Sequence, residues 1–124
     1  MPPLVQPGVV LLPRAGGCHP HVVLSEPFGP EEQVLVVNWT TLHSECIDDA
    51  CVLQKGDHPL IRHPSAISYS RAHLWRKEKI QFAIVNDAVA ELAPLAQSVL
   101  QRVIEGGRRS PELRTEWKSI LPKI

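Results

Sequence analysis

The sequence predicts a mainly β domain of the α+β class, in which a small, strongly curved antiparallel barrel precedes C-terminal helices. Two β-branched runs, at residues 21–25 and 33–41, are separated by a turn-forming stretch. From residue 88 onward the spacing of apolar residues changes from two toward 3.6, the period of a helix. A chain of 124 residues accommodates one full-size domain, with the barrel expected at about 8–80 and the helical tail at about 86–121.

The strands are predicted from the N-terminus onward. Four prolines divide the apolar segment at the start of the chain into short extended pieces. His21–Ser25 and Gln33–Thr41 are the clearest strands, and the second is apolar on both faces, which suits a central strand covered on both sides. Shorter strands are expected at Cys51–Leu53 and Ala66–Tyr69, the latter running on toward Trp75.

The helices follow. One-sided apolar spacing predicts a helix from Ala88 to Ile104, with Asn86 as its N-cap and Gly106-Gly107 as its stop. Pro94 lies inside that pattern and lacks a backbone donor, so the helix is expected to begin or kink there. A second short helix is predicted after Ser110, because this N-cap residue is followed by a proline at the first helical position.

The balanced net charge hides an asymmetry between the two halves of the chain. Residues 1–57 contain 2 basic and 7 acidic side chains, and the rest of the chain contains 11 and 6. The basic stretch at 62–79 is expected either to contact the phosphates of a nucleic acid or to be a solvated face. Arg71, Arg76 and Lys77 are therefore candidate substrate-binding residues.

Other features of the sequence argue against a membrane-spanning or a secreted protein. No run reaches the roughly 18 uninterrupted apolar residues of a spanning helix. The N-terminal apolar patch lacks the basic flank of a signal peptide. Three cysteines, an odd number without paired spacing, favour a reducing compartment. We therefore expect a cytoplasmic protein with no membrane partner.

Four of the six histidines gather in two short segments, 19–21 and 58–63. His19, His58 and His63 each precede a proline, which favours an extended backbone and projects the imidazole from a turn or strand end. Imidazole titrates near neutral pH, so two of them beside one scissile bond can serve as general base and general acid. The alternative is that the His-Pro pairs simply occupy turns of a proline-rich chain.

A metal site is a second possibility for the same segments. The potential zinc ligands are Cys18, His19, His21, Cys46, Cys51, His58 and His63. Their spacing is poor, because no CxxC pair occurs and four residues separate Cys46 from Cys51. We therefore predict no metal or other cofactor and expect Cys51 to be buried in its strand. A catalytic Cys18, activated by a neighbouring histidine, remains an alternative.

Two threonines, Thr40 and Thr41, end the expected central strand. A hydroxyl at this point either reaches a phosphate or caps the next turn. Trp39, Tyr69 and Trp75 are able to stack on bases, although alternation along their strands also places some of them in the core.

Three segments, taken in order, carry a resemblance to a known family. A glycine-bearing loop leads into Pro20–Ser25 (PHVVLS), the strand Val34–Thr41 ends in threonine, and Pro64–Tyr69 (PSAISY) opens another strand. This order resembles the PemK/MazF toxins of bacterial toxin and antitoxin modules, in which an "RPALVLS"-like strand, a strand ending in Thr or Ser, and a "PS" segment follow one another. The resemblance covers roughly residues 8 to 105.

The resemblance implies an SH3-like barrel with helical additions, a homodimer, and metal-independent endoribonuclease activity on single-stranded RNA. It also implies an antitoxin protein that covers the RNA-binding groove. His19 stands where the family has the arginine of an Arg-Pro pair, which acts by protonation or charge stabilisation, so His19 belongs in the site with its role open. Thr40 or Thr41 matches the family's strand-end hydroxyl. The stretch 57–63 aligns with none of the family's motifs, and its candidacy rests on chemistry alone.

The expected hydrolase divides the chemistry among these side chains. His58 or His19 acts as general base on a ribose 2′-hydroxyl, which attacks the adjacent phosphorus. Arg62 or His63 stabilises the charge on the phosphate oxygens, and a protonated histidine donates to the leaving 5′-oxygen. This produces a 2′,3′-cyclic phosphate and leaves DNA uncut. The full predicted set is His19, His58, Arg62, His63 and Thr41 for catalysis, with Thr40, Asp57, Arg71, Arg76 and Lys77 for substrate binding.

Two alternatives stay open. The same barrel can be a non-catalytic module that binds a protein or a nucleic acid, which loss of the family arginine favours. The density of His, Asp and Arg between residues 56 and 63 favours the enzyme, because docking has little use for several groups that titrate near pH 7. A zinc-stabilised domain is the third interpretation.

Overall fold

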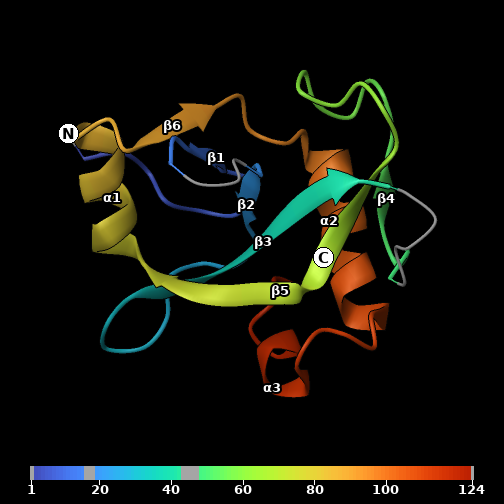
Figure 1. Cartoon of the computed structure of the whole chain (residues 1–124). Helices are drawn as coiled ribbons and strands as arrows, with labels where there is room; N and C mark the ends of the chain where they lie inside the picture. The colour runs from blue at the N-terminus through green and yellow to red at the C-terminus, as the bar shows by residue number, and fades with distance from the viewer. Residues whose placement is uncertain (1, 16–18, 43–47, 124) are drawn as a thin grey trace.

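The computed structural model describes residues 2–15, 19–42 and 48–123, and in these ranges the chain forms a curled antiparallel sheet flanked by helices (Figure 1). The strand order across the sheet is β4-β5-β3-β2-β1-β6. The predicted class, mainly β in a small barrel-like sheet with helices, is confirmed. The elements in chain order are β1 (Val10–Pro13), β2 (His21–Val23), β3 (Gln33–Thr41), β4 (Val52–Leu53), β5 (Ser65–Arg76), α1 (Lys77–Val85), β6 (Val89–Leu92), α2 (Gln97–Arg109) and α3 (Thr115–Lys118).

The strand β3 is central in the sheet and is buried on both faces, as predicted. It pairs with β2 along one edge and with β5 along the other. Leu35 and Val37 point into the larger of two hydrophobic cores, whereas Val34 and Val36 point into the smaller one, because side chains alternate along a strand. Both faces of the sheet therefore need a cover.

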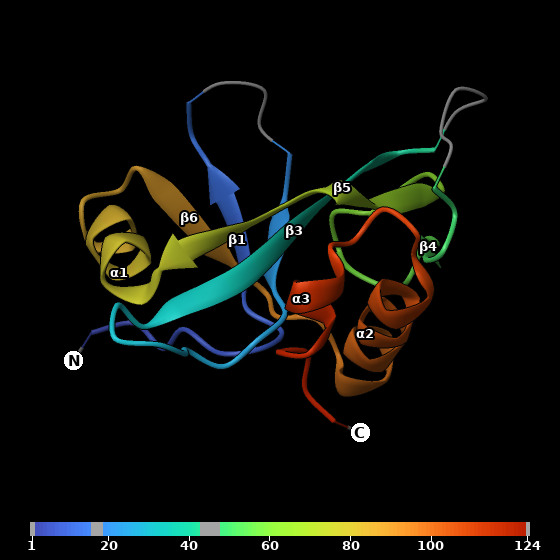
Figure 2. The same cartoon turned by 90° about the horizontal axis from the view of Figure 1, so that it is seen from below.

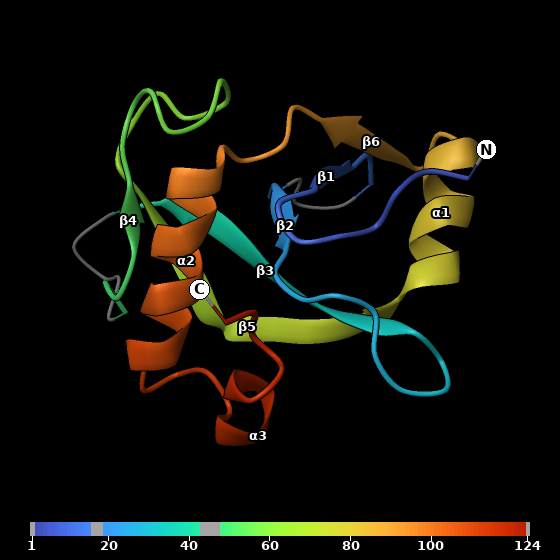
Figure 3. The same cartoon turned by 180° about the vertical axis from the view of Figure 1, so that it is seen from behind.

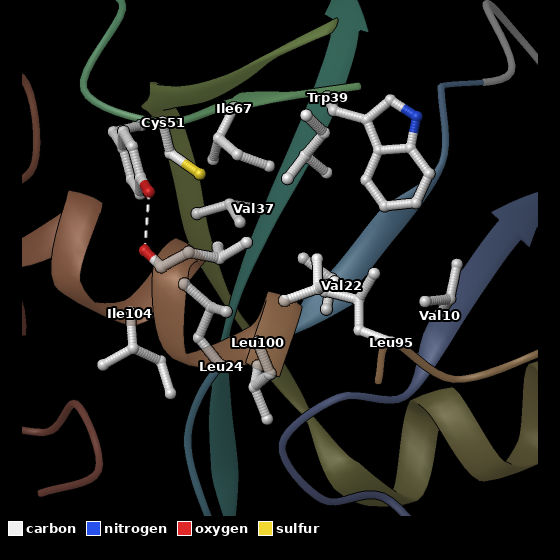
Figure 4. Close-up of a cluster of buried hydrophobic side chains, with 14 of the residues drawn as sticks. Val10, Val22, Leu24, Val37, Trp39, Cys51, Ile67, Leu95, Leu100 and Ile104 are labelled. Carbon is white, nitrogen blue, oxygen red and sulfur yellow. Dashed lines mark hydrogen bonds between the residues drawn. The ribbon is translucent and has the colours of Figure 1, made fainter. Parts of the chain in front are cut away.

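Two helices provide these covers. Leu100 and Ile104 of α2 join the larger core, and Figure 4 shows them in one cluster with Val37 of the central strand. Ile80 of α1 joins the smaller core, to which Val36 also belongs. The helices α1 and α2 lie at opposite ends of the molecule, with the curled sheet between them (Figures 2 and 3).

The predicted helix from Ala88 to Ile104 is wrong in its first part. Val89–Leu92 is the edge strand β6, which pairs with β1, and α2 begins only at Gln97. Pro94 lies between them, and its missing N–H and restricted predecessor stop a helix from running through this point. Over so few residues the apolar spacing fits either period, so the pairing with β1 decides the outcome.

Helix α1 has no counterpart among the predicted elements. Ile80 is its one fully buried residue among those described, so the apolar pattern that would have indicated a helix is weak. Asn86, predicted to be the N-cap of the following helix, is instead the C-cap of α1, and its backbone N–H donates to carbonyls of that helix. The predicted N-cap is therefore wrong, because Asn86 ends α1 and does not begin the helix that follows.

The C-terminal helix ends also differ from the prediction. Gly106 and Gly107 lie inside α2, which continues to Arg109. Ser110 does not cap the second short helix, since α3 begins at Thr115. The Ser110 hydroxyl accepts the backbone N–H of Glu112 at 3.0 Å and so closes a local turn between the two helices.

Four strand ends meet on one side of the sheet, because neighbouring strands run in opposite directions. The C-terminal ends of β1 and β3 lie beside the N-terminal ends of β2 and β5. Thr41 at the end of β3 is paired with Ser65 at the start of β5, and His21 at the start of β2 is paired with Leu11. The segments that flank these strand ends are gathered at what we call the site edge of the sheet.

Candidate functional site

A cavity of about 390 Å³ lies at the site edge. Residues predicted from the sequence line it: His19, Thr40, Thr41, Arg62 and His63. They come from segments separated by up to about 40 residues of chain, so the fold, and not local sequence, brings them together. Leu12, Pro20, Trp39, Leu60 and Ser65 complete the lining.

Different strand ends place the polar lining residues. His19 precedes β2, Thr40 and Thr41 end β3, and Arg62 and His63 belong to the loop that leads into β5. Because β3 lies between β2 and β5, the threonines lie between the histidine of one segment and the basic pair of the other. His19, Thr41, Arg62 and His63 are exposed, so a ligand in the cavity can reach them.

Main-chain hydrogen bonds attach both flanking segments to β3. The N–H of Trp39 donates to the carbonyl of Pro20 at 3.2 Å. The N–H of Leu42 donates to the carbonyl of Pro64 at 2.8 Å. The segments that carry His19 and the Arg62–His63 pair are therefore both bonded to β3. This shared attachment fixes the spacing between the two segments across the cavity.

His58 does not line the cavity, although the sequence predicted it as a catalytic base. Its ring is buried, with 4% of the residue exposed, and lies against the indole of Trp39 with ring centroids 5.4 Å apart. Nε2 lies 2.7 Å from the carbonyl oxygen of Ala93, and Nδ1 accepts the N–H of Leu60 at 3.1 Å. Both ring nitrogens are thus engaged, and the geometry favours a structural role over proton transfer to a substrate.

Asp57 also does not line the cavity, and its carboxylate instead attaches its loop to α2. Its carboxylate accepts a hydrogen bond from the Arg102 guanidinium of α2 at 3.0 Å and from the N–H of Gln54 at 2.8 Å. Burial alone would raise the pKa of Asp57, but the Arg102 hydrogen bond, the Gln54 N–H and the Arg102 charge outweigh it and lower the pKa. The loop that carries Arg62 and His63 is therefore fastened to α2.

The three predicted binding residues of the basic stretch lie elsewhere on the molecule. Arg76 ends β5 and Lys77 begins α1, roughly 25 Å from the site edge at about 3.3 Å per residue of β3. Arg76 pairs with Glu31, and Lys77 pairs with Glu32 at 3.0 Å. Arg71 is exposed within β5 and does not line the cavity. The acidic turn before β3 thus neutralises part of the basic stretch.

Among the described residues, no three of the His, Cys, Asp and Glu side chains gather as a metal ion requires. Cys18 and Cys46, two of the potential ligands, lie outside the described residues. Cys51 is buried in the larger core, as predicted, although it lies just before β4 and not within it, and burial raises the pKa of its thiol. A buried thiol with a raised pKa is a packing residue and not a nucleophile.

No family of known proteins, no curated protein and no solved structure matches the chain. The resemblance to the PemK/MazF toxins therefore rests on the sequence segments alone. Among the described residues, no helix has both the length and the apolar character needed to span a membrane.

The predicted site residues do not include four of the lining residues, Leu12, Pro20, Leu60 and Ser65, although Pro20 and Ser65 belong to segments that carry the family resemblance. Their contribution comes from position, since Ser65 is the register partner of Thr41 and its hydroxyl donates to the carbonyl of His63 at 2.9 Å. Pro20 carries one signal, because it follows a histidine already assigned to the site. Leu12 and Leu60 carry none, since isolated leucines do not indicate a cavity wall.

Proposed function

We propose that the chain is a metal-independent endoribonuclease that cleaves single-stranded RNA in the cavity at the site edge. The observation that carries the proposal is the convergence there of His19, Arg62 and His63, two exposed imidazoles and one guanidinium. Attack by a ribose 2′-hydroxyl needs a base, an acid and a positive charge at the phosphate, and these three groups supply them. The PemK/MazF resemblance supports the same reaction class.

His19 and His63 form the acid and base pair in this proposal, with His63 taking the place of His58. The neutral imidazole removes the proton of the 2′-hydroxyl, and the 2′-oxygen forms a bond to phosphorus as the bond to the 5′-oxygen breaks. The protonated imidazole donates its proton to that leaving oxygen. Arg62 stabilises the developing charge on the phosphate oxygens, and the hydroxyl of Thr41 or Thr40 holds the phosphate. The products are a 2′,3′-cyclic phosphate and a 5′-hydroxyl.

A cytoplasmic homodimer controlled by an antitoxin protein accompanies this proposal, on the ground of the family resemblance. The cavity is then the surface that an antitoxin has to cover. Copurification with a protein encoded beside the chain's own gene, and release of activity on its removal, test this part separately from the chemistry.

The test of the reaction is incubation of the purified chain with a long single-stranded RNA in EDTA, followed by analysis of fragment ends. Cyclic phosphate ends are expected, and an oligonucleotide with a 2′-deoxyribose at the cleaved position should stay intact. Because contaminating host ribonucleases also produce such ends, His19→Ala, His63→Ala and Arg62→Ala are purified in parallel. Each should lower the rate by 10²-fold or more, on the order of a lost acid, base or charge.

Two control variants each remove one histidine or one arginine, as the test variants do, but outside the cavity. His73→Ala removes a partly buried histidine outside the cavity, and Arg114→Ala removes an exposed arginine near the C-terminus. Both should cleave like the parent chain. If all variants cleave equally, the activity belongs to a contaminant and the proposal fails.

A non-catalytic binding module is the second candidate function, favoured by the histidine that replaces the family arginine at position 19. It predicts RNA or protein binding that Arg62→Ala weakens, with every RNA bond left intact. Binding of single-stranded RNAs of several different sequences, with none of them cleaved, would support this candidate.

A further inference from the structure

His58 joins three separate segments of the chain behind the cavity. Its Nδ1 accepts the N–H of Leu60 at 3.1 Å, its Nε2 lies 2.7 Å from the carbonyl of Ala93, and its ring packs on the indole of Trp39. Leu60 belongs to the loop that carries the basic pair, Ala93 to the segment between β6 and α2, and Trp39 to β3. Two of these contacts, Leu60 and Trp39, themselves line the cavity.

One protonation state satisfies both polar contacts. A carbonyl only accepts, so Nε2 must carry a proton to bond Ala93, and the N–H of Leu60 requires a free lone pair on Nδ1. The ring is therefore neutral with its proton on Nε2. Such a ring has no free nitrogen to offer a substrate, and the surrounding contacts keep it from turning toward one.

A local turn connects His58 to the basic pair, Arg62 and His63. The N–H of Ile61 donates to the carbonyl of His58 at 2.9 Å, and Pro59 takes the second position of that turn, where its fixed φ is favoured. Ile61 is buried in the larger core, and the chain emerges directly afterwards as Arg62. The direction in which Arg62 leaves the core is thus set within four residues of the imidazole.

We propose that His58 is a positioning residue, which holds the loop before β5 so that Arg62 and His63 face Thr40 and Thr41 across the cavity. This inference rests on the proposed function for its kinetic consequences, and on the loop geometry alone for its structural ones. It differs from the sequence prediction, in which His58 takes the proton itself. The two roles leave different signatures in variants that keep one of the two polar contacts.

The test compares three substitutions at position 58. In His58→Asn the side-chain oxygen takes the place of Nδ1 and accepts the N–H of Leu60, as Asn does in turns. In His58→Gln the amide takes the place of Nε2 and donates to Ala93. His58→Phe keeps an aromatic ring against Trp39 and loses both hydrogen bonds. A thermal melt of each variant verifies that it folds before any other measurement.

The structural measurement is amide hydrogen exchange at Leu60, read by NMR together with the shifts of Arg62 and His63. Protection of Leu60 is expected in the parent chain and in His58→Asn, and its loss is expected in His58→Gln and His58→Phe. Unchanged protection in His58→Phe would overturn the inference. This readout needs no catalysis, so it remains decisive even if the parent chain cleaves no RNA.

The kinetic measurement separates positioning from proton transfer. In His58→Phe, kcat should fall roughly 10-fold to 100-fold, as expected when reacting groups shift by about 1 Å, and the pH profile should keep its shape. In His58→Asn, which cannot act as a base, most of the activity should return. If instead every substitution abolishes activity and removes the limb of the pH profile that reports the base, His58 is the base and the positioning role is refuted.

Discussion

The hydroxyl of Tyr69 donates a 2.6 Å hydrogen bond to the carbonyl of Val103, which ties the middle of β5 directly to α2. Tyr69 is one of the largest fully buried side chains, and burial raises the pKa of its phenol far above the ordinary value. The bond is possible because α2 approaches the sheet through Gly106. A Cβ at this position would lie 2.5 Å from the Tyr69 oxygen and 2.8 Å from the Cβ of Cys51.

Tyr69→Phe is expected to destabilise the fold by about 1 kcal/mol, the usual net value of one buried hydrogen bond. The ring remains in the core, so its apolar contribution is retained. Urea denaturation measures the change, and an unchanged slope would indicate that the two native states are equally compact. A loss of less than about 0.3 kcal/mol would mean that the bond contributes nothing net.

Gly106→Ala should destabilise the chain, against the general rule for helices. Alanine in a helix interior is usually better than glycine by about 1 kcal/mol, but here the new methyl group meets the Tyr69 hydroxyl and the backbone carbonyl of Ala50. We expect a net loss of about 1–3 kcal/mol.

Gly107→Ala is the matched control for this change. A Cβ at Gly107 would meet its nearest atoms, on the side chains of Leu121, Tyr69 and Leu113, at 3.3–3.4 Å, a distance that small side-chain shifts can absorb. Its effect should be at least about 1 kcal/mol milder than that of Gly106→Ala. Equal unfolding midpoints for the two variants would contradict the close approach of α2 to the sheet.

The same glycines show why part of the fold was beyond sequence reasoning. A glycine pair reads as a helix stop when only local conformation is considered, yet here Gly106 is required by the contact between a helix and a strand 37 residues earlier. By contrast, β3 is recognisable from its residues because both of its faces are apolar. Local pattern thus indicates an element when the element's own side chains carry the pattern, and fails when a partner decides the outcome.

The candidate site, like the fold, is predictable from the sequence only in part. His19 and His63 were identified by their chemistry and the threonines by their place at a strand end, and the fold gathers all of them. His58 has the same His-Pro signature as these two, but sequence cannot show that its ring lies under Trp39 with both nitrogens bonded. Burial and partner geometry, not residue type, separate an anchor from a candidate acid or base.

Substituting Asp57→Asn should loosen the attachment of the loop to α2 and cost about 1 kcal/mol at neutral pH, as expected for one partly exposed ion pair with its hydrogen bonds. The pKa of Asp57 is lowered in the folded chain, so its contribution is complete above the ordinary value of 3.8 and is lost as pH falls through the lower folded pKa. The stability difference between parent and variant should therefore shrink in acid. A constant difference down to pH 3 would contradict this attribution.

His21 should lower the stability of the chain at mildly acidic pH. Burial lowers its pKa, and the charges of His73 and His19 lower it further, while a hydrogen bond that the ring donates to the backbone carbonyl of His19 opposes the shift. As the pH falls below 6.5, the unfolded chain binds a proton at this ring that the folded chain does not yet bind. The free energy of unfolding is therefore at its maximum, as far as His21 is concerned, above pH 6.5 and declines below it. NMR titration of the ring should give a midpoint below 6.5, and in His21→Phe the decline between pH 7 and 5.5 should be less steep.

Substitutions at the site edge and at the far end of β5 should have different effects on the salt dependence of RNA affinity. Arg62 is exposed in the cavity, whereas Arg76 is already paired with Glu31. Each phosphate neutralised on a single strand contributes about 0.7 to the slope of log affinity against log salt. With a 2′-deoxy oligonucleotide that resists cleavage, Arg62→Ala should reduce this slope by about 0.7. The charge-neutral double variant Arg76→Ala with Glu31→Ala should leave the slope unchanged. The opposite ranking would move the RNA path from the cavity to the far end of β5.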